Sequence, residues 1–215
     1  MQPILASPQS KRQGGYTIVE LSIALAIIGI LLVAGLSGVS SLLVTSKANT
    51  QIEESSRAMA KLQGNLTSTS VSGLTTASAI GMGIFPSTRV TGSGTTIAVS
   101  SVMGGGNEFV ASNGSTALTT SSHGIDLAAN IGAIYTLTNI PKGACSDIAA
   151  SLASIASAAY VYTATTVPTE STANGNTNLS TGNQIKAPGA AVIGTKMGTQ
   201  CNSADLVHMS FILRS

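Results

Sequence analysis

The chain has 215 residues, of which only 8% are charged and 3% aromatic, and its formal net charge is +2. A polytopic membrane protein needs several apolar runs of about 20 residues, whereas this chain has one, and a disordered chain would carry more charge and fewer aliphatic side chains. The 10 Lys and Arg residues form no basic stripe, so the composition predicts no nucleic-acid partner.

An uncharged apolar run extends from Leu21 to Thr45. As a helix rising about 1.5 Å per residue it reaches about 37 Å, which is enough to cross a bilayer core of about 30 Å. Lys11 and Arg12 precede the run and Lys47 follows it, so the positive-inside rule keeps the N-terminus in the cytoplasm and places the body of the chain outside. The apolar core of a cleavable secretory signal is only about 7–15 residues long, which leaves a plain membrane anchor as the ordinary alternative.

One carboxylate, Glu20, directly precedes the apolar run, at a position where a plain anchor would carry an apolar side chain. A charged side chain well inside a membrane costs about 2.5–3.5 kcal/mol, so Glu20 requires a partner. If the chain were cut after Gly15, Tyr16 would expose a new ammonium group, which the Glu20 of a neighbouring copy could neutralise. The helix dipole also favours a carboxylate in the first turn.

The segment Lys11–Leu21, KRQGGYTIVEL, followed by the long apolar run, resembles the N-terminus of type IV pilins. The resemblance implies that a prepilin peptidase removes residues 1–15 by cutting after Gly15. It also implies that Tyr16 is N-methylated and that Glu20 is the glutamate used in assembly. Tyr16 in place of the usual Phe, together with the length of the leader, is most like the long-leader type IVb class.

The helical pattern continues past the apolar run, and we predict one long helix over residues 16–67 with its transmembrane half at 21–45. Beyond Thr45 the apolar residues fall on one face of a helix, as in an amphipathic segment that packs on a globular head. The residues of this face are Ile52, Met59, Leu62 and Leu66. Glu53 and Arg57 are spaced for a salt bridge.

The membrane half of this helix contains three glycines, Gly29, Gly35 and Gly38, which suit close approach of helices, a bend or local melting. Gly64 and the Ser/Thr-rich tract after it indicate the end of the helix.

Residues 68–215 have the composition of a globular α+β head. Several short runs alternate apolar and polar residues, as half-buried antiparallel strands do: Thr95–Val102, Glu108–Ala111, Ile134–Leu137, Tyr160–Thr166 and His208–Leu213. A further helix is predicted at Ser146–Ala159, with Ser146 as its cap, and a short one near Gly124–Asn130. Val167–Lys186 reads as a surface loop.

The two cysteines, Cys145 and Cys201, both lie in the part of the chain predicted to be outside the cytoplasm. Pairing is the usual state in an oxidising compartment, and loop-entropy arithmetic gives such a bridge roughly 4 kcal/mol. Two buried thiols or a metal pair are the alternatives. The resemblance implies a disulfide-bounded region, here 145–201, that is exposed on a filament.

Signals for enzymatic chemistry are weak in this sequence. His123 and His208 are the only histidines, and neither belongs to a cluster with metal-ligand spacing. Gly-rich stretches occur without the Lys-Ser/Thr of a phosphate-binding loop, and no nucleophile motif is evident. We therefore expect no enzymatic activity, no cofactor and no metal.

The sequence predicts an α+β protein in which a long N-terminal helix packs through its second half on an antiparallel sheet. The resemblance implies a filament subunit that polymerises with copies of itself. It starts as a precursor in the bacterial inner membrane, engages an assembly platform and its ATPase, and ends in an extracellular pilus for adhesion, aggregation, DNA transfer or motility. A minor pilin or pseudopilin, and a membrane-anchored enzyme or ligand-binding head, are the alternatives.

Overall fold

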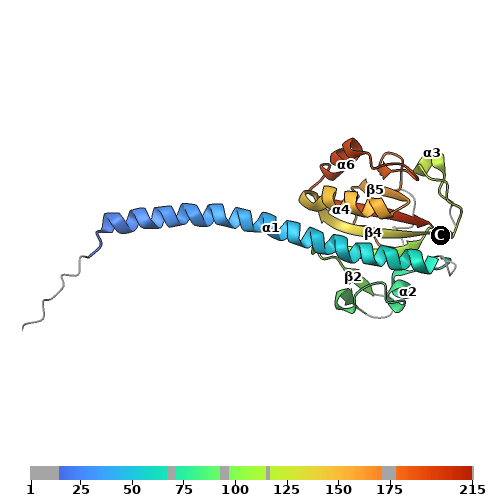
Figure 1. Ribbon diagram of the computed structural model, residues 1–215, viewed down its shortest axis with the longest axis horizontal. Coiled ribbons are helices and arrows are strands. Elements are labelled where there is room, and N and C mark those ends of the chain that lie inside the picture. The colour runs from blue at the N-terminus through green and yellow to red at the C-terminus, as the bar shows by residue number, and fades with distance from the viewer. Residues whose placement is uncertain (1–14, 67–70, 93–96, 115–116, 171–177, 215) are drawn as a thin grey trace, which may run out of the picture. The chain divides into compact units, whose positions relative to one another are not determined.

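The computed structural model describes residues 15–66, 71–92, 97–114, 117–170 and 178–214 (Figure 1). The leader predicted at residues 1–15, with Lys11 and Arg12, therefore lies outside the described residues except for Gly15. The chain divides into two compact units, Met1–Leu42 and Leu43–Ser215.

A single helix, α1 (Ile18–Leu66), accounts for the described N-terminal part of the chain. No proline interrupts this segment, and its Ala, Leu and Ile content favours a helix, so the few glycines within it are tolerated. The helix is described as far as Leu66, and the Ser/Thr-rich tract in which its end was predicted begins with residues 67–70, which lie outside the described residues.

In the second compact unit, α1 places one face on the core. Ala48, Ala58, Met59 and Leu62 are buried there, and Ile52 packs against them while partly exposed. The i, i+4 pair Glu53 and Arg57 forms a salt bridge of 2.5 Å on the solvent side. Ile52, Met59 and Leu62 lie on this face as the spacing of apolar residues predicted, whereas the side chain of Leu66 is outside the described residues.

The head contains one seven-stranded sheet in the order β1-β2-β3-β4-β7-β5-β6, with every neighbouring pair antiparallel. The strands are β1 (Val90–Thr91), β2 (Ala98–Ser100), β3 (Asn107–Ser112), β4 (Gly132–Pro141), β5 (Ala158–Tyr162), β6 (Gln184–Lys186) and β7 (Leu206–Arg214). The C-terminal strand β7 lies between β4 and β5 and joins the two halves of the sheet. The α+β architecture with a long N-terminal helix is therefore confirmed.

Both faces of the sheet are covered. On one face, side chains such as Tyr135, Met209 and Phe211 share a core with α1 and with α4 (Lys142–Ile155). On the other face a second core joins the sheet to residues 118–127 and to Leu179. The central strands are therefore buried on both sides, with polar side chains such as Thr136 and Ser210 bonded to each other, and the prediction of half-buried strands is wrong for them.

The helix predicted at Ser146–Ala159 is α4, and its predicted limits are wrong. It begins four residues earlier, directly after Pro141, which ends β4 and serves as N-cap without a side-chain bond, so Ser146 is not the cap. Its last residue is Ile155, and the chain then enters β5. Lys186 Nζ donates to the carbonyl oxygens of Ala153 and Ala156, at 2.6 and 2.7 Å, and stabilises this end of α4.

Other local predictions also need correction. The short helix expected near Gly124–Asn130 is wrong: that segment is not helical, and the helix α3 (Thr120–His123) ends before it, where Gly124 takes a left-handed conformation at φ 67. Within the loop expected at Val167–Lys186, residues 171–177 lie outside the described residues, but β6 closes the segment and pairs with β5. Of Thr95–Val102, residues 95–96 are not described and the strand covers only Ala98–Ser100.

Within the described residues, three short helices were not predicted, namely α2 (Thr76–Gly81), the 3-10 helix η1 (Ser87–Arg89) and α6 (Gly194–Cys201). Their sequences are rich in Gly, Ser and Thr, and helix propensity alone does not favour them.

Candidate processing and assembly site at the start of the long helix

The predicted cleavage residues lie just before α1. Gly15, Tyr16 and Thr17 are outside the helix, and Tyr16 is 87% exposed. A Cβ placed on Gly15 would meet nothing within 4 Å. The backbone at the Gly15–Tyr16 bond is therefore not enclosed by this chain's own described side chains, as a protease substrate requires.

Glu20 lies in the first turn of α1 and is bonded within its own chain. Its Oε2 accepts from the backbone N–H and from the Oγ1 of Thr17, both at 3.3 Å, and its own N–H donates to Thr17 Oγ1 at 3.2 Å. These reciprocal bonds form a capping box, in which Thr17 is the N-cap and Glu20 the third helical residue. Sequence reasoning missed this role of Thr17, although the Thr-x-x-Glu spacing is the usual signal for it.

The capping box changes the electrostatics of Glu20. Its carboxylate is exposed and receives two hydrogen bonds from Thr17 while it also interacts favourably with the helix dipole. Hydrogen bonds lower the cost of placing a carboxylate near lipid, though no ion pair of Glu20 with a described residue is found. A cation delivered by another molecule would complete the site.

The helix that follows presents apolar side chains on all its sides. From Leu21 to Leu43 the large apolar residues are each more than half exposed. By length and composition α1 is able to cross a membrane, with a mean hydropathy of 2.6 in its most apolar window and none of that window buried. This helix and the motif before it fit a membrane-anchored precursor.

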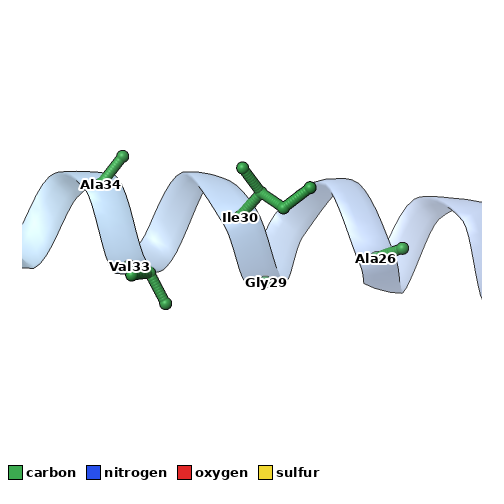
Figure 2. Close-up of a pocket in the computed structure, with 5 residues that line it drawn as sticks. All are labelled: Ala26, Gly29, Ile30, Val33 and Ala34. Carbon is green, nitrogen blue, oxygen red and sulfur yellow. The ribbon is translucent and has the colours of Figure 1, made fainter.

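A surface pocket lies on this apolar helix, and Figure 2 shows the residues that line it. The pocket is lined by Ala26, Gly29, Ile30, Val33 and Ala34, in which the side chains of Ile30 and Val33 stand out and Gly29 has none. A Cβ placed on Gly29, Gly35 or Gly38 meets nothing within 4 Å. These glycines are therefore not required by packing within the chain.

The two cysteines of the head form a disulfide. Cys145 on α4 and Cys201 at the end of α6 are bonded, with their Cα atoms 5.5 Å apart. The bridge ties α6 to α4 and encloses β5 and β6 between its two ends in sequence. Of the alternatives, free thiols and a metal pair are thereby excluded in this structure.

Both histidines occupy structural positions in the head. His123 Nδ1 accepts from the backbone N–H of Thr119 at 3.1 Å, and His208 Nδ1 accepts from that of Asn139 at 3.2 Å. Burial lowers the pKa of His208 below its usual range. Among the described residues, no three His, Cys, Asp or Glu side chains come together as metal ligands.

One buried carboxylate, Glu108, belongs to a polar cluster that sequence reasoning did not find. We refer to Gln51, Ser55, Glu108 and Tyr135 as the Glu108 cluster; all four are buried, and they join α1 to β3 and β4. No sequence signal brings these positions together, because the contact depends on how α1 packs against the sheet.

Comparison with known proteins places the site in a recognised group. Residues 10–36 match the family model described as prokaryotic N-terminal methylation motif, which is the signature of type IV prepilins. We find no significant match among curated proteins. The motif and the α+β architecture together support a type IV pilin-like protein and do not assign the IVb class.

Proposed function

We propose that this type IV pilin-like chain is a structural, non-enzymatic subunit of a type IV pilus. A prepilin peptidase cuts between Gly15 and Tyr16 and Tyr16 is N-methylated. The apolar segment Leu21–Thr45 then holds the subunit in the bacterial inner membrane. An assembly platform driven by a cytoplasmic ATPase subsequently moves it into a filament.

The observation that carries the proposal is the capped Glu20 at the start of an apolar helical segment whose large side chains are each more than half exposed, within a matched methylation motif. In the part of the chain that the structure describes, the Glu20 carboxylate accepts hydrogen bonds from Thr17. Cleavage creates an ammonium group on Tyr16, and the Glu20 of a neighbouring subunit accepts it. Transfer of an apolar helix from lipid to a protein bundle gains little hydrophobic energy, so packing and this ion pair steer assembly.

Charge supports polymerisation of identical subunits. Removal of residues 1–15 takes away Lys11 and Arg12 and leaves eight basic and eight acidic side chains. Copies without net charge pack together without long-range repulsion. Contacts that are heterologous and do not close on themselves then produce a helical filament.

A pseudopilin or minor pilin of a secretion or uptake system shares the same motif and acts at low copy. Purified filaments separate the two roles, because a major subunit accounts for most of their protein. Adhesion, aggregation and DNA transfer are the roles we propose for a filament in which this chain is the major subunit.

Mass spectrometry of the mature N-terminus in the native host tests the processing step. We expect a chain that begins at Tyr16 and carries one methyl group, and accumulation of the uncut chain in a strain without the peptidase. An intact Met1 in a peptidase-positive strain, or a cut after Thr45, would refute the proposal.

Variants of Glu20 and Thr17 test the assembly step separately from the capping box. Glu20→Ala should still be processed but should form no filaments. Thr17→Val removes the hydroxyl of the capping box while keeping the carboxylate, and costs about 1 kcal/mol of helix stability, so filaments should persist. Equal loss of filaments in both processed variants would show that capping, not ion pairing, is the role of Glu20.

A further inference from the structure

The Glu108 cluster joins the second half of α1 to the sheet through a carboxylate that is only 3% exposed. Gln51 Nε2 donates to Glu108 Oε1 at 2.7 Å, and the Tyr135 hydroxyl donates to Glu108 Oε2 at 2.5 Å. Both of these donors are neutral. The carboxylate is therefore buried with hydrogen bonds but without a directly bonded cation in the described contacts.

The cluster also holds the loop between β2 and β3. Gln51 Oε1 accepts from the backbone N–H of Val102 at 2.8 Å and from Ser101 Oγ at 2.9 Å. Ser55 Oγ lies 2.8 Å from Gln51 Nε2 and 3.0 Å from the Tyr135 hydroxyl. One glutamine side chain thus bridges the helix, the strand β3 and the loop.

The charged groups that face Glu108 come from two elements. Glu54 lies on α1 and Arg89 on η1, and they form an ion pair of 3.2 Å with each other. The two groups shift the pKa of Glu108 in opposite directions, because Glu54 disfavours the ionised carboxylate and Arg89 favours it. Burial is the largest effect and raises the pKa of Glu108 above its usual range, against the hydrogen bonds from Gln51 and Tyr135. The pKa of Tyr135 is raised well above its usual range, first by burial, so it stays a donor.

We propose that the Glu108 cluster is a proton-dependent latch, which holds the second half of α1 and the β2–β3 loop on the sheet more firmly as the surroundings acidify. When Glu108 is neutral, the cluster contains no buried charge. When Glu108 is ionised, a charge is buried with only neutral donors bonded to it, and the docking of α1 weakens. This inference concerns the head alone and holds whether or not the chain forms filaments.

The direction of the pH effect follows from proton linkage. The folded state binds the Glu108 proton more tightly than the unfolded state, whose glutamates titrate near about pH 4.3. The added stability is therefore complete below that pH and is lost as the pH rises through the higher pKa of the folded state. Most paired carboxylates show the opposite dependence. His208 also opposes it, because its lowered pKa makes the folded state less stable in acid.

Hydrogen exchange measured on the full chain in detergent micelles tests the latch. The reporter is the Val102 amide, whose protection is corrected for the intrinsic pH dependence of exchange. In the wild type we expect protection to rise on going from pH 7.5 to pH 5, by up to about tenfold per pH unit within the window between the two pKa values. In Glu108→Gln this rise should be absent, while the contribution of His208 cancels in the comparison.

Two further variants keep the test decisive. Glu53→Gln removes an exposed carboxylate of α1, the helix that the cluster holds, and its Val102 amide should show the same pH dependence as in the wild type. Tyr135→Phe removes a hydrogen-bond donor that favours the ionised form of Glu108, so the pH window in which protection changes should move upward. This variant tests the latch if Glu108→Gln does not fold. A wild-type rise that persists unchanged in Glu108→Gln, or a window that does not move in Tyr135→Phe, would overturn the latch.

Discussion

Replacement of Gly29, Gly35 and Gly38 together by alanine separates packing within the chain from packing between chains. A Cβ at each position meets nothing within 4 Å, so the change creates no clash in the single subunit. Alanine favours a helix over glycine by about 1 kcal/mol per residue, so the isolated helix should gain about 3 kcal/mol. Helical content of the variant in micelles, followed by circular dichroism on heating, should match or exceed that of the wild type.

Assembly should respond in the opposite direction. If neighbouring helices approach these glycines, each added methyl group overpacks a contact and costs about 1–3 kcal/mol. Every 1.4 kcal/mol is about a tenfold change in an association constant, so sheared-filament yield should fall by at least about tenfold. Gly64→Ala is the matched control, because it also lies in α1 with no neighbour within 4 Å of its Cβ but outside the apolar segment. Normal filament yield from the triple variant would refute both close approach and a glycine-dependent bend.

Three predictions concern the head. Lys186→Met leaves the last carbonyls of α4 without their charged donor, so it should cost about 2 kcal/mol of stability. Calorimetry should show a Tm about 4–8 °C lower. Lys196→Met, at an exposed site, is the control and should change the Tm little. In Gly106→Ala the new Cβ would overlap a backbone carbonyl oxygen of β4, and we expect a loss of about 2–3 kcal/mol in urea unfolding; an unchanged midpoint would contradict the close approach. Replacing Cys145 and Cys201 together by serine should cost about 4 kcal/mol under oxidising conditions, and adding a reductant should then have no further effect.

Local signals predicted the helix and the apolar segment well. The run from Leu21 to Thr45 and the amphipathic spacing after it require only the helical period and the absence of proline. Each of these features depends on residues within one or two turns of one another.

The head was predicted less completely because its elements depend on distant partners. Residues 146–159 carry the alanine content of a helix throughout, yet Ala158 and Ala159 join β5, where they pair with Ile212 and Phe211 of β7. The strand β6 is only three residues long, and its pairing with β5 is what makes it a strand. In both cases tertiary contacts outweigh a weak local preference.

The candidate site shows the same division. Gly15, Tyr16 and Glu20 are adjacent in sequence and form a recognisable motif, while the bonds between Thr17 and Glu20 became evident only in three dimensions. Glu108 was one of several scattered acids until the fold brought it to Gln51, which is 57 positions away in the chain.

The sequence alone determined the composition, the single apolar helix, the motif before it and the α+β character of the rest. These follow from periodicity and from charges whose effects are local. Only the tertiary structure decided that β7 lies between β4 and β5, that both faces of the sheet are covered, and that a buried carboxylate joins α1 to the sheet. The physical reason is that burial and hydrogen-bond partners are set by residues far apart in the chain, and no local pattern encodes their meeting.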